Sequence, residues 1–267
     1  MAADTLEGVV QTANAAVTIQ RPLNHVEVWT VRQGAPEVQA RLDAYRSLLT
    51  DEEQQRARRF LHAADEARFV IGRALARTML SACAPVGVRQ WTFTIDAHGR
   101  PVLATRPPGA LDLRFNLTHT DGLIACAVTI GREVGIDAEC ITRSLTHDVA
   151  ERFFSSREVA DLHALPVADQ PVVFFDYWTL KESYIKARGL GLALPLGQFA
   201  FIRTPGRAPA IEFAPELHDD AASWQFAQFW PTAEHRMAVA VRRHGADLPI
   251  TVTDVCLLYT SPSPRDS

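Results

Sequence analysis

The chain has 267 residues, of which 47% are hydrophobic and 22% are charged, a globular composition that allows a sizeable core. Its formal net charge of −4 gives no overall attraction to nucleic acid or to an anionic membrane surface. The four cysteines are far apart and form no CxxC pair, which indicates reduced thiols rather than disulfides or a zinc site. The sequence has no signal-peptide pattern and no apolar run of membrane-spanning length, so we expect a cytoplasmic protein.

The first half reads as helices followed by strands, after a leader of residues 1–20 that we expect to be flexible. Residues 25–32 alternate as a strand does, and residues 36–49 have a helical pattern. Thr50 and Glu53 form a capping box at the start of a further helix. A helix from Asp65 to about residue 82 precedes the strand-like runs QWTFTID, LRFNLTH and LIACAVTI, and a fourth run, VGIDAE, follows at residues 134–139.

The second half repeats this order. Ser155 and Glu158 form another capping box, and a long helix covers residues 171–188 with Gly189 as its stop. The strand-like runs FAFIR, AIEF, WQFAQFW, HRMAVAVRR and ITVTDV follow.

Helices followed by strands, twice over, predict an α+β fold of two pseudo-symmetric α/β halves rather than a doubly wound sheet. We place the halves at residues 21–131 and 132–255. Residues 256–267 depart in composition from the rest of the chain, and we expect them to be a non-native tail.

Asp137 and Glu139 are two residues apart in a predicted strand, so their carboxylates project from the same face. Two neighbouring carboxylates repel each other unless a cation lies between them or one is protonated. A hard divalent cation such as Mg²⁺, with phosphate oxygens and waters as further ligands, would satisfy such a pair. The alternative is a solvated pair of acids at an exposed strand end.

Glu182 and Lys186 lie one turn apart on a single helix face. As a surface ion pair they would contribute only about 0.3–0.5 kcal/mol. Lys181 and Lys186 are, however, the only lysines among 27 basic residues. In a chain so biased to arginine, we interpret the two lysines as a sign of chemistry that needs a compact ammonium group.

The strand 115–120 ends in Thr118, His119 and Thr120, whose hydroxyl and imidazole groups can donate hydrogen bonds to a phosphate. A polar turn is the alternative interpretation. Several arginines, including Arg56 and Arg68, form a local positive patch in spite of the acidic total.

Taken together and in order, these segments closely resemble the Sfp-type 4′-phosphopantetheinyl transferases. The resemblance runs from Arg56 to Phe201. It is carried by RRFLHAADEARFVIGRALAR, HGRPVL, FNLTHTDGLIACAV, VGIDAE, RFFSSREVADL and WTLKESYIKARGLGLALPL. It implies a coenzyme A cleft between the two halves and a reaction in which the phosphopantetheine group moves to a serine of a carrier protein.

The resemblance also implies a magnesium site made by Asp137, Glu139 and Glu182. By the same comparison, Lys186 contacts the diphosphate of coenzyme A. Arg56 falls where the family often has a basic residue that binds phosphate. Magnesium would offset the charge that develops on the leaving group, 3′,5′-ADP.

Five further positions match coenzyme A contacts of the family. Arg68, Thr118 and His119 match residues that hold the 3′-phosphate and its neighbour, while Arg100 and Pro101 match the adenosine end. Thr118 stands where serine is usual, and arginine replaces lysine at several basic positions.

The general base is either Glu158, a position proposed for this task in the family, or Glu182. We favour Glu182 because a helix-capping acid is already hydrogen-bonded and is therefore a weaker base. Two other functions stay open: a magnesium-dependent nucleotide pyrophosphate hydrolase, or a non-catalytic module that binds carrier proteins. We expect a monomer whose partners are coenzyme A and an apo acyl or peptidyl carrier protein, with no nucleic acid or membrane involved.

Overall fold

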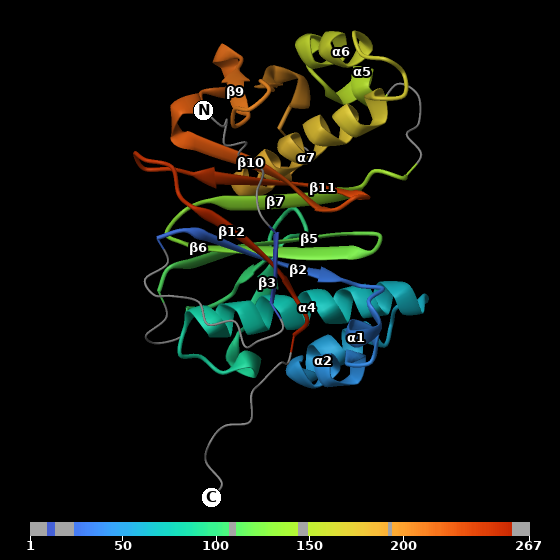
Figure 1. Cartoon of the computed structure of the whole chain (residues 1–267). Helices are drawn as coiled ribbons and strands as arrows, with labels where there is room; N and C mark the ends of the chain where they lie inside the picture. The colour runs from blue at the N-terminus through green and yellow to red at the C-terminus, as the bar shows by residue number, and fades with distance from the viewer. Residues whose placement is uncertain (1–9, 14–23, 107–110, 144–148, 192–193, 258–267) are drawn as a thin grey trace, which may run out of the picture.

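Two β-sheets are stacked face to face, and one long helix covers the outer face of each sheet, so that the molecule has four layers (Figure 1). The computed structural model describes residues 10–13, 24–106, 111–143, 149–191 and 194–257. Within these residues the fold is the predicted α+β arrangement of two related halves.

The first half runs from a strand through helices to an antiparallel pair of strands. Its elements are β2 (Val26–Arg32), α1 (Pro36–Gln39), α2 (Leu42–Leu48), α3 (Asp51–Ala57), α4 (Ala63–Cys83), the 3-10 helix η1 (Val88–Gln90), β3 (Phe93–Ile95), β4 (Pro101–Leu103), β5 (Leu113–Thr120) and β6 (Leu123–Ile130). The single helix predicted for residues 36–49 is two short ones, because Arg41 adopts φ −109° and ψ 8° and interrupts the helical backbone. The capping box of Thr50 and Glu53 is confirmed.

The second half follows the same order. Its elements are β7 (Val134–Cys140), α5 (Val149–Phe153), α6 (Ser156–His163), α7 (Gln170–Arg188), the 3-10 helices η3 (Leu196–Gln198), η4 (Pro215–Leu217) and η5 (Ala221–Ser223), and the strands β8 (Phe199–Ile202), β9 (Ala210–Phe213), β10 (Trp224–Thr232) and β11 (His235–Arg242). Its sheet order β10-β11-β7 corresponds to the order β5-β6-β2 in the first half. Strands β2 and β7, and helices α4 and α7, are therefore equivalent elements.

The last strand, β12 (Ile250–Val255), leaves the second half and joins the sheet of the first, between β1 (Val10–Ala13) and β2. It runs parallel to both neighbours. The described residues include parts of the predicted leader and of the predicted tail. The leader contains a paired strand at Val10–Ala13, although its other residues lie outside the described chain, and the expected tail contributes Leu257, which is 3% exposed, to the core.

Three clusters of buried side chains fill the spaces between the layers. One lies between α4 and the first sheet, a second between α7 and the second sheet, and a third between the two sheets. Strand β6 is buried on both faces: Ile124 packs towards α4, whereas Leu123 and Ala125 pack towards the other sheet. This double burial explains why the run LIACAV is almost wholly apolar. Among the described residues, no helix has both the length and the apolar character that crossing a bilayer requires.

Candidate active site

A cleft of about 630 Å³ lies where the two halves meet. It is lined by the β3–β4 hairpin and β5 from the first half, and by β7 and α7 from the second. Strands β5 and β7 are outer strands of their own sheets and lie side by side. The cleft is therefore built from both halves and exists only once they pack together.

Most of the predicted site residues line this cleft. They are Arg100, Pro101, Thr118, His119, Asp137, Glu139, Glu182 and Lys186. Arg56, Arg68 and Glu158 do not belong to the lining.

Asp137 lies at the centre of the site and is 5% exposed. Its Oδ1 atom accepts a hydrogen bond from Lys186 Nζ at 2.5 Å and another from the Thr118 hydroxyl at 3.3 Å. Its Oδ2 atom is buried and has no hydrogen-bond partner within the described part of the chain. A buried carboxylate oxygen without a partner is costly, and a cation would satisfy it.

The three acids are under electrostatic strain from burial and from one another. Burial, with repulsion from Asp137 and Glu139, raises the pKa of Glu182 to about 7. Burial and then Asp137 raise the pKa of Glu139, and burial raises that of Asp137 against the opposing charge of Lys186. Like charges in one cleft behave in this way, and a divalent cation would relieve the repulsion.

The donor set fits magnesium, which prefers carboxylate oxygens, and the buried Oδ2 atom of Asp137 faces no competing partner. In the described ranges, no group of three His, Cys, Asp or Glu side chains is arranged to hold a metal ion. The ammonium group of Lys186 forms an ion pair with the carboxylate of Asp137.

Gly135 explains how α7 brings Glu182 up to the strand that carries the other acids. A Cβ atom at position 135 would lie 2.0 Å from the carbonyl oxygen of Ser183 and 2.4 Å from the backbone nitrogen of Ala187. Only glycine permits so close an approach of helix to strand. The sequence pattern contained this glycine, but its role could be seen only with α7 in place.

Arg100 ties the β3–β4 hairpin to the end of α7. Its Nε atom lies 3.0 Å from Asp96 Oδ2, and its Nη1 atom donates a hydrogen bond to the carbonyl oxygen of Lys186. Gly189, with φ +64°, makes room for this guanidinium group, because a Cβ atom there would lie 2.7 Å from Arg100 Nη2. Arg100 thus helps to hold the two walls of the cleft together.

His119 lines the cleft from β5, and Arg68 on α4 lies close enough for its charge to act on the His119 ring. Desolvation of its ring, with the positive charges of Arg68 and Lys186, lowers the pKa of His119, so the imidazole is neutral at neutral pH. Arg68 is outside the cleft lining and is paired with Asp65 at 2.8 Å and Asp121 at 2.9 Å.

Arg56 is separated from the acids. It lines another hollow of about 970 Å³ and lies over the ring of Phe69, 5.3 Å from its centroid. The predicted phosphate contact of Arg56 therefore has no support in the geometry of the cleft.

The structure also corrects the candidate role of Glu158, which is 0% exposed. Its carboxylate accepts hydrogen bonds from the backbone of Ser155 and of Phe201, and pairs with Lys181 Nζ at 2.8 Å. With its oxygens enclosed in this way, Glu158 cannot reach a substrate. Of the two lysines, Lys186 lines the cleft, whereas Lys181 is a buried core residue.

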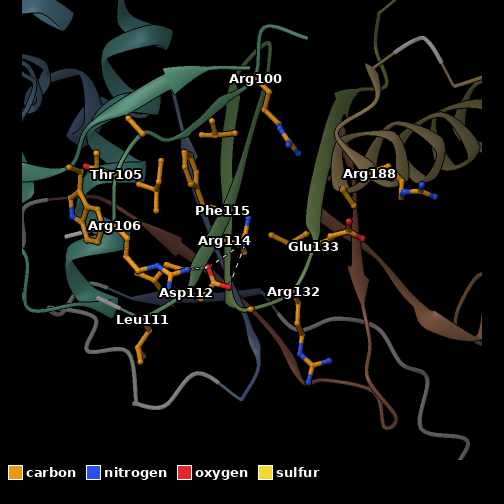
Figure 2. Close-up of a pocket in the computed structure, with 18 residues that line it drawn as sticks. Arg100, Thr105, Arg106, Leu111, Asp112, Arg114, Phe115, Arg132, Glu133 and Arg188 are labelled. Carbon is orange, nitrogen blue, oxygen red and sulfur yellow. Dashed lines mark hydrogen bonds and ion pairs between the residues drawn. The ribbon is translucent and has the colours of Figure 1, made fainter. Parts of the chain in front are cut away.

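Figure 2 shows a second pocket, of about 460 Å³, whose lining shares Arg100 with that of the cleft. Arg106 and Arg114 both turn towards Asp112 in this view. None of the three acids of the cleft lines it. This pocket is therefore not the place where the predicted site residues meet.

Comparisons with known proteins identify the family of this chain. The model of the 4′-phosphopantetheinyl transferase superfamily matches residues 133–240, and a model of a 4′-phosphopantetheinyl transferase N-terminal region matches residues 35–130. The chain is 33% identical to the 4′-phosphopantetheinyl transferase HetI of Nostoc sp., over 83% of this chain and 90% of that protein. It is 30% identical to the 4′-phosphopantetheinyl transferase Sfp of Bacillus subtilis, over 66% of this chain and 75% of that protein.

Among solved structures, the holo-[acyl-carrier-protein] synthase of Helicobacter pylori in complex with coenzyme A is 24% identical, with a TM-score of 0.34, over 41% of this chain and 99% of that one. The family models and the relatives together define the class: the chain belongs to the 4′-phosphopantetheinyl transferase superfamily.

Proposed function

We propose that this protein transfers the 4′-phosphopantetheine group of coenzyme A to a serine of an apo acyl or peptidyl carrier protein, with Mg²⁺ as cofactor. The observation that carries the proposal is that Asp137, Glu139 and Glu182 line one cleft with Lys186, in a member of this enzyme family. A non-catalytic binding module would have no need of three acids that repel one another.

Asp137, Glu139 and Glu182 are the residues that would hold magnesium. When bound, the ion supplies positive charge that offsets the negative charge developing on the diphosphate leaving group. The side chain of Lys186 is 27% exposed and forms an ion pair with Asp137. Its ammonium group can therefore turn from that carboxylate to a phosphate oxygen.

Coenzyme A would lie along the cleft with its phosphates at the β5 end. The neutral imidazole of His119 would donate a hydrogen bond to a phosphate, and the guanidinium group of Arg68 would supply positive charge nearby. Arg100 and Pro101 form the hairpin wall proposed for the adenosine end. The proposal leaves out Arg56 and Glu158, because neither lines the cleft.

In the reaction, the serine hydroxyl oxygen attacks the β-phosphorus and forms a new P–O bond. The bond from that phosphorus to the bridging oxygen breaks, and 3′,5′-ADP leaves. The serine proton passes to a base, and we assign this role to Glu182, whose carboxylate lines the cleft, whereas that of Glu158 does not.

Intact-mass analysis of apo carrier proteins incubated with coenzyme A and Mg²⁺ tests the proposal. We expect the carrier to gain one phosphopantetheinyl group, and a chelator to abolish the gain. Release of phosphopantetheine from coenzyme A without any carrier protein would instead identify a pyrophosphate hydrolase. Binding of the carrier with no change in mass would identify a binding module.

A further inference from the structure

A row of three side chains on β5 joins the two sheets beside the acids. Asn116, Thr118 and Thr120 are alternate residues of this strand and therefore project from one face. Their oxygen atoms accept hydrogen bonds from three backbone N–H groups of β7, those of Ile136 at 3.0 Å, Ala138 at 3.3 Å and Cys140 at 3.2 Å. Because β7 is an outer strand of its sheet, these N–H groups have no neighbouring strand to bond.

The two threonines of the row also hold the acids. The Thr118 hydroxyl donates to Asp137 Oδ1 at 3.3 Å, and the Thr120 hydroxyl donates to Glu139 Oε2 at 3.4 Å. The third member of the row, Asn116, bonds to the backbone of Ile136 and to neither carboxylate. Each threonine thus fixes one carboxylate oxygen to the strand that faces it.

A hydroxyl group has one hydrogen to donate and two lone pairs to accept with. Thr118 uses all three: it donates to Asp137, and it accepts from the Ala138 N–H and from Lys186 Nζ at 3.1 Å. It has no capacity left for a phosphate while these bonds are made. The predicted phosphate contact of Thr118 therefore gives way to a contact with the carboxylate.

In each acid these bonds reach only one of the two carboxylate oxygens, and this determines the orientation of the carboxylate. Thr118 and Lys186 occupy only Oδ1 of Asp137, while Oδ2 has no partner within the described residues. Thr120 and Arg143 occupy only Oε2 of Glu139. Outer hydrogen bonds of this kind orient metal ligands and tune their affinity.

We propose that Thr118 and Thr120 are positioning residues, which hold one oxygen of Asp137 and of Glu139 and so present the other oxygen to the divalent cation. This inference rests on the cation site of the proposed function. It adds Thr120, which does not line the cleft, to the residues that determine how tightly the cation binds.

The affinity for Mn²⁺ as a magnesium probe tests the role of Thr120. Free Mn²⁺ is measured by electron paramagnetic resonance in the presence of coenzyme A and without carrier protein, so that no turnover occurs. Thr120→Val keeps the shape of the side chain and removes the hydroxyl. We expect it to raise the Kd for Mn²⁺ by about 10–100-fold, as loss of an outer hydrogen bond to a metal ligand does. Thr120→Ser should restore an affinity near that of wild type.

Asn116→Leu is the matched control, because it removes a bond of the same row without touching an acid. It should lower the thermal midpoint as Thr120→Val does and leave the Kd for Mn²⁺ unchanged. If the Thr120→Val variant does not fold, Thr120→Ala is measured in its place. Equal Mn²⁺ affinity in Thr120→Val and wild type, or an equal loss in Asn116→Leu, would overturn the positioning role. Failure of the wild-type protein to bind Mn²⁺ would instead overturn the cation site of the proposed function.

Discussion

Glu158 and Lys181 form an ion pair of 2.8 Å inside the second half, where their side chains are 0% and 1% exposed. The first half contains the same arrangement: Glu53, also the acid of a capping box, pairs at 2.7 Å with Arg77, which is 1% exposed. In both halves, a helix-capping glutamate anchors a basic residue of the long helix. The first half contributes none of Asp137, Glu139 and Glu182, and its pair still forms, so the repeated pair is a feature of the fold.

Glu158→Gln should therefore lower stability by about 3–5 kcal/mol, because it leaves the Lys181 charge buried without a partner. Chemical denaturation measures this loss. The double variant Glu158→Gln with Lys181→Met should be less destabilised than the sum of the single variants. Glu182→Gln is the contrasting variant: it should keep its thermal midpoint and lose transfer activity. A Glu158→Gln enzyme that is stable but inactive would contradict this assignment.

Gly135→Ala should separate α7 from β7. The new Cβ atom meets backbone atoms of Ser183 and Ala187, which cannot move aside as a flexible side chain can. We expect a loss of about 1–3 kcal/mol in the free energy of unfolding and a larger KM for Mg²⁺, since Glu182 moves away from Asp137. Gly197→Ala is the control, because nothing lies within 4 Å of its added Cβ atom. If both variants behave alike, the close approach is not what positions Glu182.

Asp137→Asn should separate activity from stability. The variant loses a proposed cation ligand, and such a cation contributes several kcal/mol to the transition state, so transfer should fall by roughly 100-fold or more. The fold should persist, because burial raises the pKa of Asp137 and a neutral amide is less costly there than a carboxylate. Carrier-loading rates and thermal denaturation are the two measurements. Wild-type turnover in this variant would contradict the metal role.

The contribution of Asp219 to the free energy of unfolding should depend on pH. Burial alone would raise the pKa of Asp219, but hydrogen bonds from Tyr184 at 2.7 Å and Trp224 at 3.0 Å, together with the charge of Arg188, hold it below its ordinary value. A carboxylate with a lowered folded-state pKa stabilises the protein above its unfolded pKa, near 4, and loses that contribution as the pH falls further. Asp219→Asn should be less stable than wild type at about pH 7, and the gap should narrow below about pH 4. Urea denaturation at both pH values measures this gap, and a constant gap would show that the Asp219 charge is not responsible.

Local patterns in the sequence predicted most of the elements and many of the residues that line the cleft. Alternation placed Asp137 and Glu139 on one strand face, and helical spacing placed Glu182 one turn from Lys186. The capping boxes at Thr50 and Ser155 are confirmed, because each depends on residues only three apart. Short-range geometry of this kind is fixed by the backbone itself.

Only the tertiary structure decided which of two similar side chains has which role. Lys181 and Lys186 are five positions apart on one helix, yet Lys181 is enclosed with Glu158 and Lys186 contacts Asp137 in the cleft. The return of β12 to the first sheet, and the threonine hydroxyls that hold the acids, likewise depend on partners far away in the chain. Such contacts form only when the two halves pack, and no spacing within one segment determines which distant group will lie opposite.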